Sequence, residues 1–234
     1  MIPLTIGLII LFGVAVLIYF GLLHRVLDRM RLDDRQALLI IGLMVVTSFV
    51  TLPLYRRGLQ VSLNVGGALV PVAVAIYLLV KADERREWIR ALLATVATVV
   101  VLTIVTNLTD FDPPDADFMD PLWFFGLVAG VSGYLAGRSR RSAFIAATLG
   151  IVALDVIHLI RAVVEGVPAT VNLGGAGVYD ATVLAGVIAV GLAELVGEVR
   201  ERLQGGPAER EDAPLPLRNE DFAQEVAKED EPDA

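Results

Sequence analysis

The sequence predicts an all-α fold, a polytopic membrane helix bundle with about seven transmembrane helices. Apolar residues make up 56% of the 234 residues, and the mean hydropathy is +0.68, above the usual value for a soluble domain. These residues gather in segments that approach the ~20 residues a helix needs to cross a bilayer. Basic residues concentrate in alternate connections between the segments, a pattern typical of multipass proteins.

The length and pattern of the segments favour helices, because a membrane barrel would show short alternating segments instead. We place the spans at 2–23, 36–54, 61–80, 91–108, 121–137, 142–162 and 177–197. The first segment has no basic region before it and no small-residue cleavage site after it. We therefore expect an uncleaved first helix rather than a signal peptide.

The connections predict the orientation. The segments 24–35, 81–90 and 138–141 hold four, four and three basic residues, whereas "TDFDPPDADFMD" (109–120) holds five aspartates and no base. The positive-inside rule then places the three basic connections in the cytoplasm and the N-terminus outside, in the cell (plasma) membrane.

The acidity of the chain belongs to its C-terminal end. Residues 204–234 hold ten acids and three bases, which accounts for −7 of the net charge of −8. This Pro-rich, charged composition predicts a disordered cytoplasmic tail after a transmembrane domain at 1–203. No basic footprint for nucleic acid is present. The chain has no cysteine, and its two histidines, His24 and His158, are far apart, so we predict no metal site and no cofactor.

Small residues recur at helix spacing in two of the predicted spans. The seventh carries Ala181, Ala185, Ala189, Ala193 and Gly197. The fifth carries the pairs Gly126/Gly130 and Gly133/Gly137. Such ridges let helix backbones approach closely, so we expect tight helix packing along them.

An internal repeat links two distant segments. Shifting the chain by 108 residues aligns "GLQVSLNVGGA" (58–68) with "GVPATVNLGGA" (166–176), and five of the eleven positions are identical. Chance similarity in a chain rich in Gly and Ala is the alternative to duplication. A duplication would give a 3+1+3 arrangement of parallel repeats, an architecture found in some small sugar transporters.

The glycine pairs in the two copies predict irregular backbone. A third helix starting after Gly67 would reach only about 20 Å by residue 80, short of a ~30 Å hydrocarbon core. We therefore expect broken or re-entrant segments at 61–67 and 168–177, covered by protein or lining a watery cavity. The alternative is that Asn64 and Asn172 only cap the helices that follow.

Two acids fall inside predicted spans. Asp155 lies in the sixth with His158 at i+3 on the same face, and Asp180 lies at the start of the seventh. Intramembrane acids are costly and usually face the bundle interior with a partner. The alternative is that Asp155 only locks the fold by bonding His158 or the Asn172 loop. The predicted polar intramembrane site comprises Asn64, Gly66, Gly67, Asp155, His158, Asn172, Gly174, Gly175, Gly177 and Asp180.

The segments "LNVGGALVP" (63–71), "GIVALDVIHL" (150–159) and "NLGGAGVYDATVLAGVIAV" (172–190) resemble an uncharacterised family of prokaryotic multipass membrane proteins, a domain of unknown function. Its members carry a GGA-x-x-P block, an Asp-containing helix and a GGAG-x-x-D block. The resemblance implies an integral membrane location and makes Pro71 a signature position together with Asp155, Asp180 and the glycines of both blocks. It names no activity.

A weaker likeness is to intramembrane aspartyl proteases of the presenilin and signal-peptide-peptidase type. These carry one Asp on a helix and a Gly-x-Gly-Asp motif on the next. Here Val178 and Tyr179 separate Gly177 from Asp180, and "ALVP" (68–71) replaces the Pro-Ala-Leu stretch. Both departures argue against catalysis, although a pair of carboxyl groups can activate water.

The leading hypothesis is a small-solute or ion transporter or permeation protein, not an enzyme, with the polar site binding an unknown solute or ion within the lipid bilayer. The first alternative is an intramembrane aspartyl protease using Asp155 and Asp180. The second is a non-enzymatic membrane scaffold whose acidic tail recruits a partner. Neither the substrate nor the oligomeric state follows from the sequence.

Overall fold

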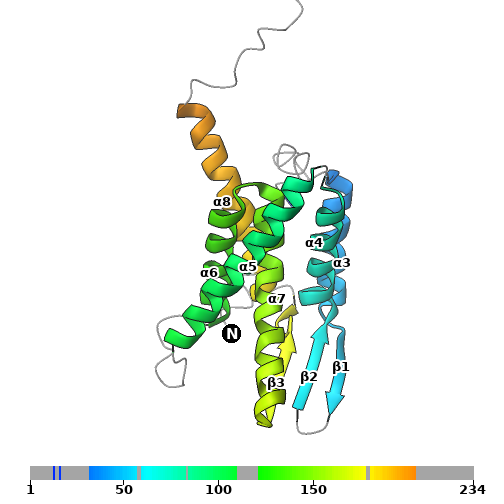
Figure 1. The fold of residues 1–234 in the computed structure, drawn as a ribbon. Coiled ribbons are helices and arrows are strands. Elements are labelled where there is room, and N and C mark those ends of the chain that lie inside the picture. The colour runs from blue at the N-terminus through cyan, green and yellow to red at the C-terminus, as the bar shows by residue number, and fades with distance from the viewer. Residues whose placement is uncertain are drawn as a thin grey trace, which may run out of the picture. The chain divides into compact units, whose positions relative to one another are not determined.

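A computed structural model describes residues 13, 16, 32–56, 59–82, 84–109, 121–177 and 180–203. Most of the predicted span 2–23 and the whole tail 204–234 lie outside this part of the chain. The described residues divide into two units, one that ends at Val196 and one that begins at Gly197. The described elements (Figure 1) are α3 (Asp34–Thr47), β1 (Thr51–Arg56), β2 (Leu59–Asn64), the π-helical turn η1 (Val65–Leu69), α4 (Val70–Val80), α5 (Arg85–Leu108), α6 (Pro121–Gly137), α7 (Arg140–Glu165), β3 (Ala169–Leu173) and α8 (Ala181–Leu203).

Three of the helices in the described part of the chain are long and apolar enough to cross a membrane. By length and composition these are α5, α7 and the Ala181–Arg200 part of α8. The apolar helices Arg35–Thr47, Val65–Val80 and Pro121–Gly137 are shorter. The mostly helical, membrane-compatible fold is therefore confirmed, whereas the count of seven spans stays a prediction.

The prediction of an all-α fold is wrong at one place, because a three-stranded sheet with the order β1-β2-β3 interrupts it. In each of the predicted helices 36–54 and 61–80, one end forms a strand instead. Along β2 and β3, apolar residues alternate with Gln60, Ser62, Thr170 and Asn172, and such alternation favours a strand over a helix. Pro53 lies on β1, an edge strand, where a missing N–H is tolerated. The predicted broken segments 61–67 and 168–177 are thus a strand followed by a π-helical turn and a strand followed by a tight turn.

The two copies of the proposed repeat lie side by side. β2 pairs with β3 in parallel, from Leu59↔Ala169 to Leu63↔Leu173. The paired residues Ser62 and Asn172 are 110 positions apart, whereas the sequence alignment has an offset of 108. A slip of two residues keeps every side chain on the same face of the sheet, because strands have a period of two. The parallel direction agrees with copies of the same orientation, and duplication itself stays a prediction.

The sheet rests on the C-terminal half of α7 (Figure 1). Val61 and Leu173 from the apolar face of the sheet form a buried cluster with Ala68, and Val152 and Leu159 of α7 pack against it. The opposite face carries Ser62 and Asn172, which are half-buried and exposed. One face of the sheet is therefore part of the protein core, and the other is polar.

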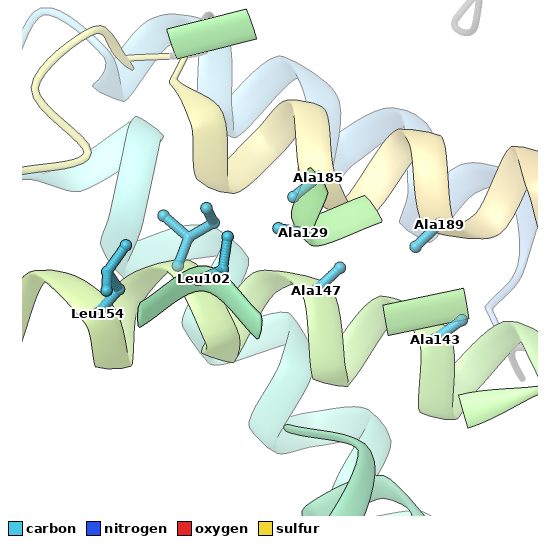
Figure 2. Close-up of a cluster of buried hydrophobic side chains, with 8 residues drawn as sticks. Leu102, Ala129, Ala143, Ala147, Leu154, Ala185 and Ala189 are labelled. Carbon is cyan, nitrogen blue, oxygen red and sulfur yellow. The ribbon is translucent and has the colours of Figure 1, made fainter. Parts of the chain in front are cut away.

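The predicted small-residue ridges are confirmed as packing surfaces. Ala185 and Ala189 of α8 meet Ala129 of α6 and Ala147 of α7 in one fully buried cluster (Figure 2). On α6, a Cβ added to Gly130 would lie 2.6 Å from Ile188 Cγ2. On the same helix, a Cβ on Gly133 would lie 2.8 Å from the amide nitrogen of Ala147. Backbone contact along these ridges replaces side-chain interdigitation.

One end of the bundle is fixed by ion pairs. Arg140 at the start of α7 pairs with Glu194 of α8, and Arg141 pairs with Glu87 of α5 at 3.1 Å. We call this the basic end. Because α7 starts there, Asp155 and the sheet lie toward the opposite end.

Candidate functional site

Most of the predicted site residues lie where strands give way to helices, whereas Asp155 and His158 lie within α7. Two such junctions meet, one at Asn64–Ala68 between β2 and α4, the other at Gly174–Asp180 between β3 and α8. The α3–β1 turn around Ser48 is the third contributor. Sequence reasoning missed Ser48, because nothing in the repeat points to it.

Asn64 holds the first junction together. It is buried, with 2% of its surface exposed. Its Nδ2 donates to the Ser48 carbonyl at 2.6 Å and to Thr51 Oγ1 at 3.1 Å, and its Oδ1 accepts from the Gly67 N–H at 2.8 Å. Asn64 therefore caps η1 and ties it to α3 and β1, so both ends of its amide are engaged by the chain itself.

The glycine pairs allow the two junctions to touch backbone to backbone. A Cβ on Gly67 would collide with the Gly174 carbonyl oxygen and lie 2.6 Å from that of Gly177. A Cβ on Gly66 would lie 2.6 Å from the amide nitrogen of Ser48. Gly174 and Gly177 also have φ of +66° and +64°, a region that favours glycine. These four glycines are required for close approach, which is a structural role.

Asn172 and Gly175 lie apart from that contact. Asn172 is exposed, its Oδ1 accepts from Ser62 Oγ at 2.6 Å, and its backbone carbonyl accepts from the Gly175 N–H at 3.1 Å. Asn172 does not cap α8. The two asparagines that the repeat aligns thus have different environments, one buried in a junction and the other on the polar face of the sheet.

Asp180 caps α8. Its Oδ1 accepts from the Thr182 N–H at 3.0 Å and from Thr182 Oγ1 at 2.8 Å, and its Oδ2 accepts from the Ala176 N–H at 3.3 Å. Its carbonyl accepts the first helical bonds from Val183 and Leu184. A carboxylate in this position is favourable because the helix N-terminus presents unpaired N–H groups and a partial positive charge.

Asp155 interacts with Asp180 electrostatically, without a hydrogen bond between them. It is half-buried on α7, and its carboxyl lies within electrostatic range of the Asp180 carboxyl. Within the described part of the chain Asp155 makes no hydrogen bond or ion pair. The expected bond to His158 does not form among these residues; His158 is half-buried and interacts electrostatically with Arg161.

The two carboxylates lie at a similar distance from the basic end. Asp155 follows Arg140 by 15 residues and Asp180 precedes Glu194 by 14, which at 1.5 Å per residue is about 22 Å and about 21 Å. Because Arg140 and Glu194 form an ion pair, both helices are measured from one level. The geometry thus agrees with the expectation of similar depth.

Comparison with family models identifies the chain. Residues 18–192 match the family described as "Protein of unknown function (DUF1614)". The chain belongs to this family. The match spans every predicted site residue, from Asn64 to Asp180, and it bears out the resemblance to an uncharacterised family. Comparisons with curated proteins and with solved structures gave no match.

The candidate site in this member of the DUF1614 family thus combines two kinds of residue. Asn64 and the glycines Gly66, Gly67, Gly174 and Gly177 build the junctions, and Asp180 is fixed by three donors. Asp155 is the acid whose oxygens no described donor engages. A carboxylate in this situation is chemically suited to bind a proton or a small cation, and two carboxyl groups in range of each other are the elements of an acid–base pair.

Proposed function

We propose that this protein is a multipass protein of the cell membrane with its basic end in the cytoplasm. The support comes from the lengths of α5, α7 and α8 and from the basic connections at 81–90 and 138–141. Trp88 near the start of α5 is 44% exposed, and Trp123 lies in the first turn of α6 at the other end. Tryptophans at both ends of a bundle match the two interfaces of a bilayer.

In this placement the site lies within the lipid. The two carboxyl groups lie about 21–22 Å from the basic end. If that end marks the cytoplasmic boundary, this depth is beyond the midplane of a ~30 Å hydrocarbon core and short of its outer surface. Irregular backbone at that depth requires cover from protein. The contact of Gly67 with Gly174 and Gly177 and the seating of the sheet on α7 provide such cover.

The function proposed for this site is ion or small-solute transport, with Asp155 as the group that binds a proton or a cation. The observation that carries the proposal is the Asp155 carboxyl, which no donor in the described part of the chain engages and which lies within electrostatic range of the capped Asp180 carboxyl. A carboxylate without donors inside a span is costly unless it is protonated or binds a cation. Transport would couple to the binding and release of that ion.

Flux into proteoliposomes tests this function. Purified protein is reconstituted, a pH gradient or a gradient of an alkali cation is imposed, and flux is compared between the native chain, Asp155→Asn and Glu165→Gln. Glu165 is an exposed acid at the end of α7 and serves as the matched control. We expect Asp155→Asn to reduce flux at least about tenfold, because the neutral amide can neither take up a proton nor balance the charge of a cation, and a contact to a charged group contributes ~1.5–3 kcal/mol. Equal flux in all three proteins would rule the proposal out.

A second function is favoured by a separate observation. β3 is an edge strand that leads directly into the turn before Asp180. An extended peptide can add to such an edge through main-chain hydrogen bonds, which would bring it near two carboxyl groups. In an intramembrane aspartyl protease, Asp155→Asn and Asp180→Asn would both abolish cleavage of a fluorogenic transmembrane peptide. Cleavage that survives either change would exclude this function.

A further inference from the structure

A groove between α5 and α6 at the basic end combines an apolar floor with two arginines. It is lined by Ile89, Leu93, Ala94 and Ala97 of α5, by Ala136 of α6, and by Arg86 and Arg90, and its volume is about 500 Å³. The α5 residues fall on one side of the helix because their spacing follows three- and four-residue steps. The groove therefore runs along the bundle with its cationic part at the end where α5 begins.

The two arginines are available to a ligand. Both side chains are exposed, and within the described part of the chain neither forms an ion pair, in contrast to Arg140 and Arg141. They are one helical turn apart, so two guanidinium groups lie on the same side of α5. Guanidinium groups bind phosphate oxygens in a bidentate manner.

We propose that this groove binds an anionic phospholipid of the cytoplasmic leaflet. Arg86 and Arg90 contact the phosphate, and one acyl chain lies along Leu93, Ala94 and Ala97. The choice of occupant follows from charge complementarity together with the position of Trp88, whose exposed ring on the same turn marks the headgroup level. This inference rests on the proposed membrane placement and is independent of ion binding at Asp155.

The absence of cysteine from the chain permits a direct test. A fluorophore is attached to Ala97→Cys, and its quenching by phosphatidylglycerol with brominated acyl chains is compared with that by brominated phosphatidylcholine in nanodiscs of phosphatidylcholine. Ile104→Cys, on the same helix and exposed outside the groove, is the matched label control. We expect stronger quenching by phosphatidylglycerol at position 97 and equal quenching by both lipids at position 104.

Charge variants complete the test. Arg86→Gln with Arg90→Gln should weaken the preference for phosphatidylglycerol about thirtyfold, since each basic side chain near an anionic surface contributes ~1 kcal/mol. Arg35→Gln, which removes an exposed arginine of α3, should leave the preference unchanged, and so should Asp155→Asn. Equal quenching by the two lipids in the native background would overturn the proposal. Chemical cross-linking of the cysteine in the Ala97→Cys variant to another segment or to a second copy would also overturn it, because the groove would then be occupied by protein. A preference that persists in the double variant would overturn it too.

Discussion

Gly67 and Gly174 lie so close that the backbone of one occupies the space where the side chain of the other would begin. A Cβ on Gly174 would lie 2.5 Å from the carbonyl carbon of Gly67, and a Cβ on Gly67 would strike the Gly174 carbonyl oxygen. The residues are 107 positions apart in the chain. Their contact joins the two strand–helix junctions, so the stability of the site depends on the absence of side chains at both positions.

Gly67→Ala should therefore destabilise the fold. The added methyl group would also lie 2.6 Å from the Gly177 carbonyl oxygen, and overpacking of this kind costs ~1–3 kcal/mol or more. Gly42→Ala is the matched control, because nothing lies within 4 Å of a Cβ at this helical glycine, and Ala favours a helix over Gly by ~1 kcal/mol. Thermal unfolding in detergent should show a lower midpoint for Gly67→Ala and an equal or higher one for Gly42→Ala. Equal midpoints for both variants would contradict the close approach.

Two substitutions of Asp180 distinguish the contribution of its capping hydrogen bonds to stability from that of its charge. Asn retains an oxygen that can accept from Thr182, whereas Ala does not, and loss of an N-cap acceptor costs ~0.5–2 kcal/mol. We expect Asp180→Ala to lower the unfolding free energy by about that amount and Asp180→Asn to stay close to the native value. Denaturant unfolding monitored by Trp fluorescence measures both. If Asn is as harmful as Ala, the hydrogen bonds to Thr182 are not what stabilises the start of α8.

Elements of the fold could be predicted where a local sequence pattern, such as one apolar run, indicated a single type of secondary structure. The helices α5, α6, α7 and α8 were predicted because each contains one apolar run, and close packing at Gly130 was expected from the spacing of small residues. That the helix in contact with Gly130 would be α8 was not predicted. β2 was missed because "LQVSLN" continues into the apolar run of α4, and a short apolar stretch cannot be assigned to helix or strand by hydropathy alone. The alternation of Gln60 and Ser62 with apolar neighbours was the available signal.

Several residues of the predicted site lie close together in the structure, whereas their individual contacts were not predicted, and the site itself stays a prediction. Asp155 and Asp180 could be placed at similar depth because both are counted along regular helices. The partners of Asn64 could not be predicted, since Ser48 and Thr51 are 16 and 13 residues away, where α3 gives way to β1 and no motif marks the junction. The repeat also suggested equal roles for Asn64 and Asn172, yet only the first is buried. Tertiary contacts with α3, which has no counterpart beside Asn172 among the described residues, account for the difference.

Asn64 should be the most sensitive polar residue of the junctions. Asn64→Ala would leave the Gly67 N–H and the Ser48 carbonyl without their partner, and each unsatisfied buried group costs ~1–3 kcal/mol. Asn172→Ala removes one bond at an exposed position, so we expect a loss of at most ~1 kcal/mol. Thermal midpoints in detergent compare the two directly. A larger loss for Asn172 than for Asn64 would show that the buried junction is not the more stabilising of the two.

The pairing of β2 with β3 can be tested by cross-linking in a chain that has no cysteine of its own. Ser62 and Asn172 are directly paired and joined by a hydrogen bond of 2.6 Å between their side chains, so the Ser62→Cys/Asn172→Cys pair should form a disulfide under mild oxidation. Thr170 pairs with Gln60 instead, two residues along the strand, and diagonal neighbours of this kind are ~7–8 Å apart, beyond the reach of a disulfide. The Ser62→Cys/Thr170→Cys pair should consequently stay reduced. Because the repeat alignment places Ser62 opposite Thr170, the reverse result would mean that the strands pair in the register of the repeat. Protease cleavage within 109–120 followed by non-reducing gel electrophoresis distinguishes the outcomes, since a disulfide keeps the two fragments together.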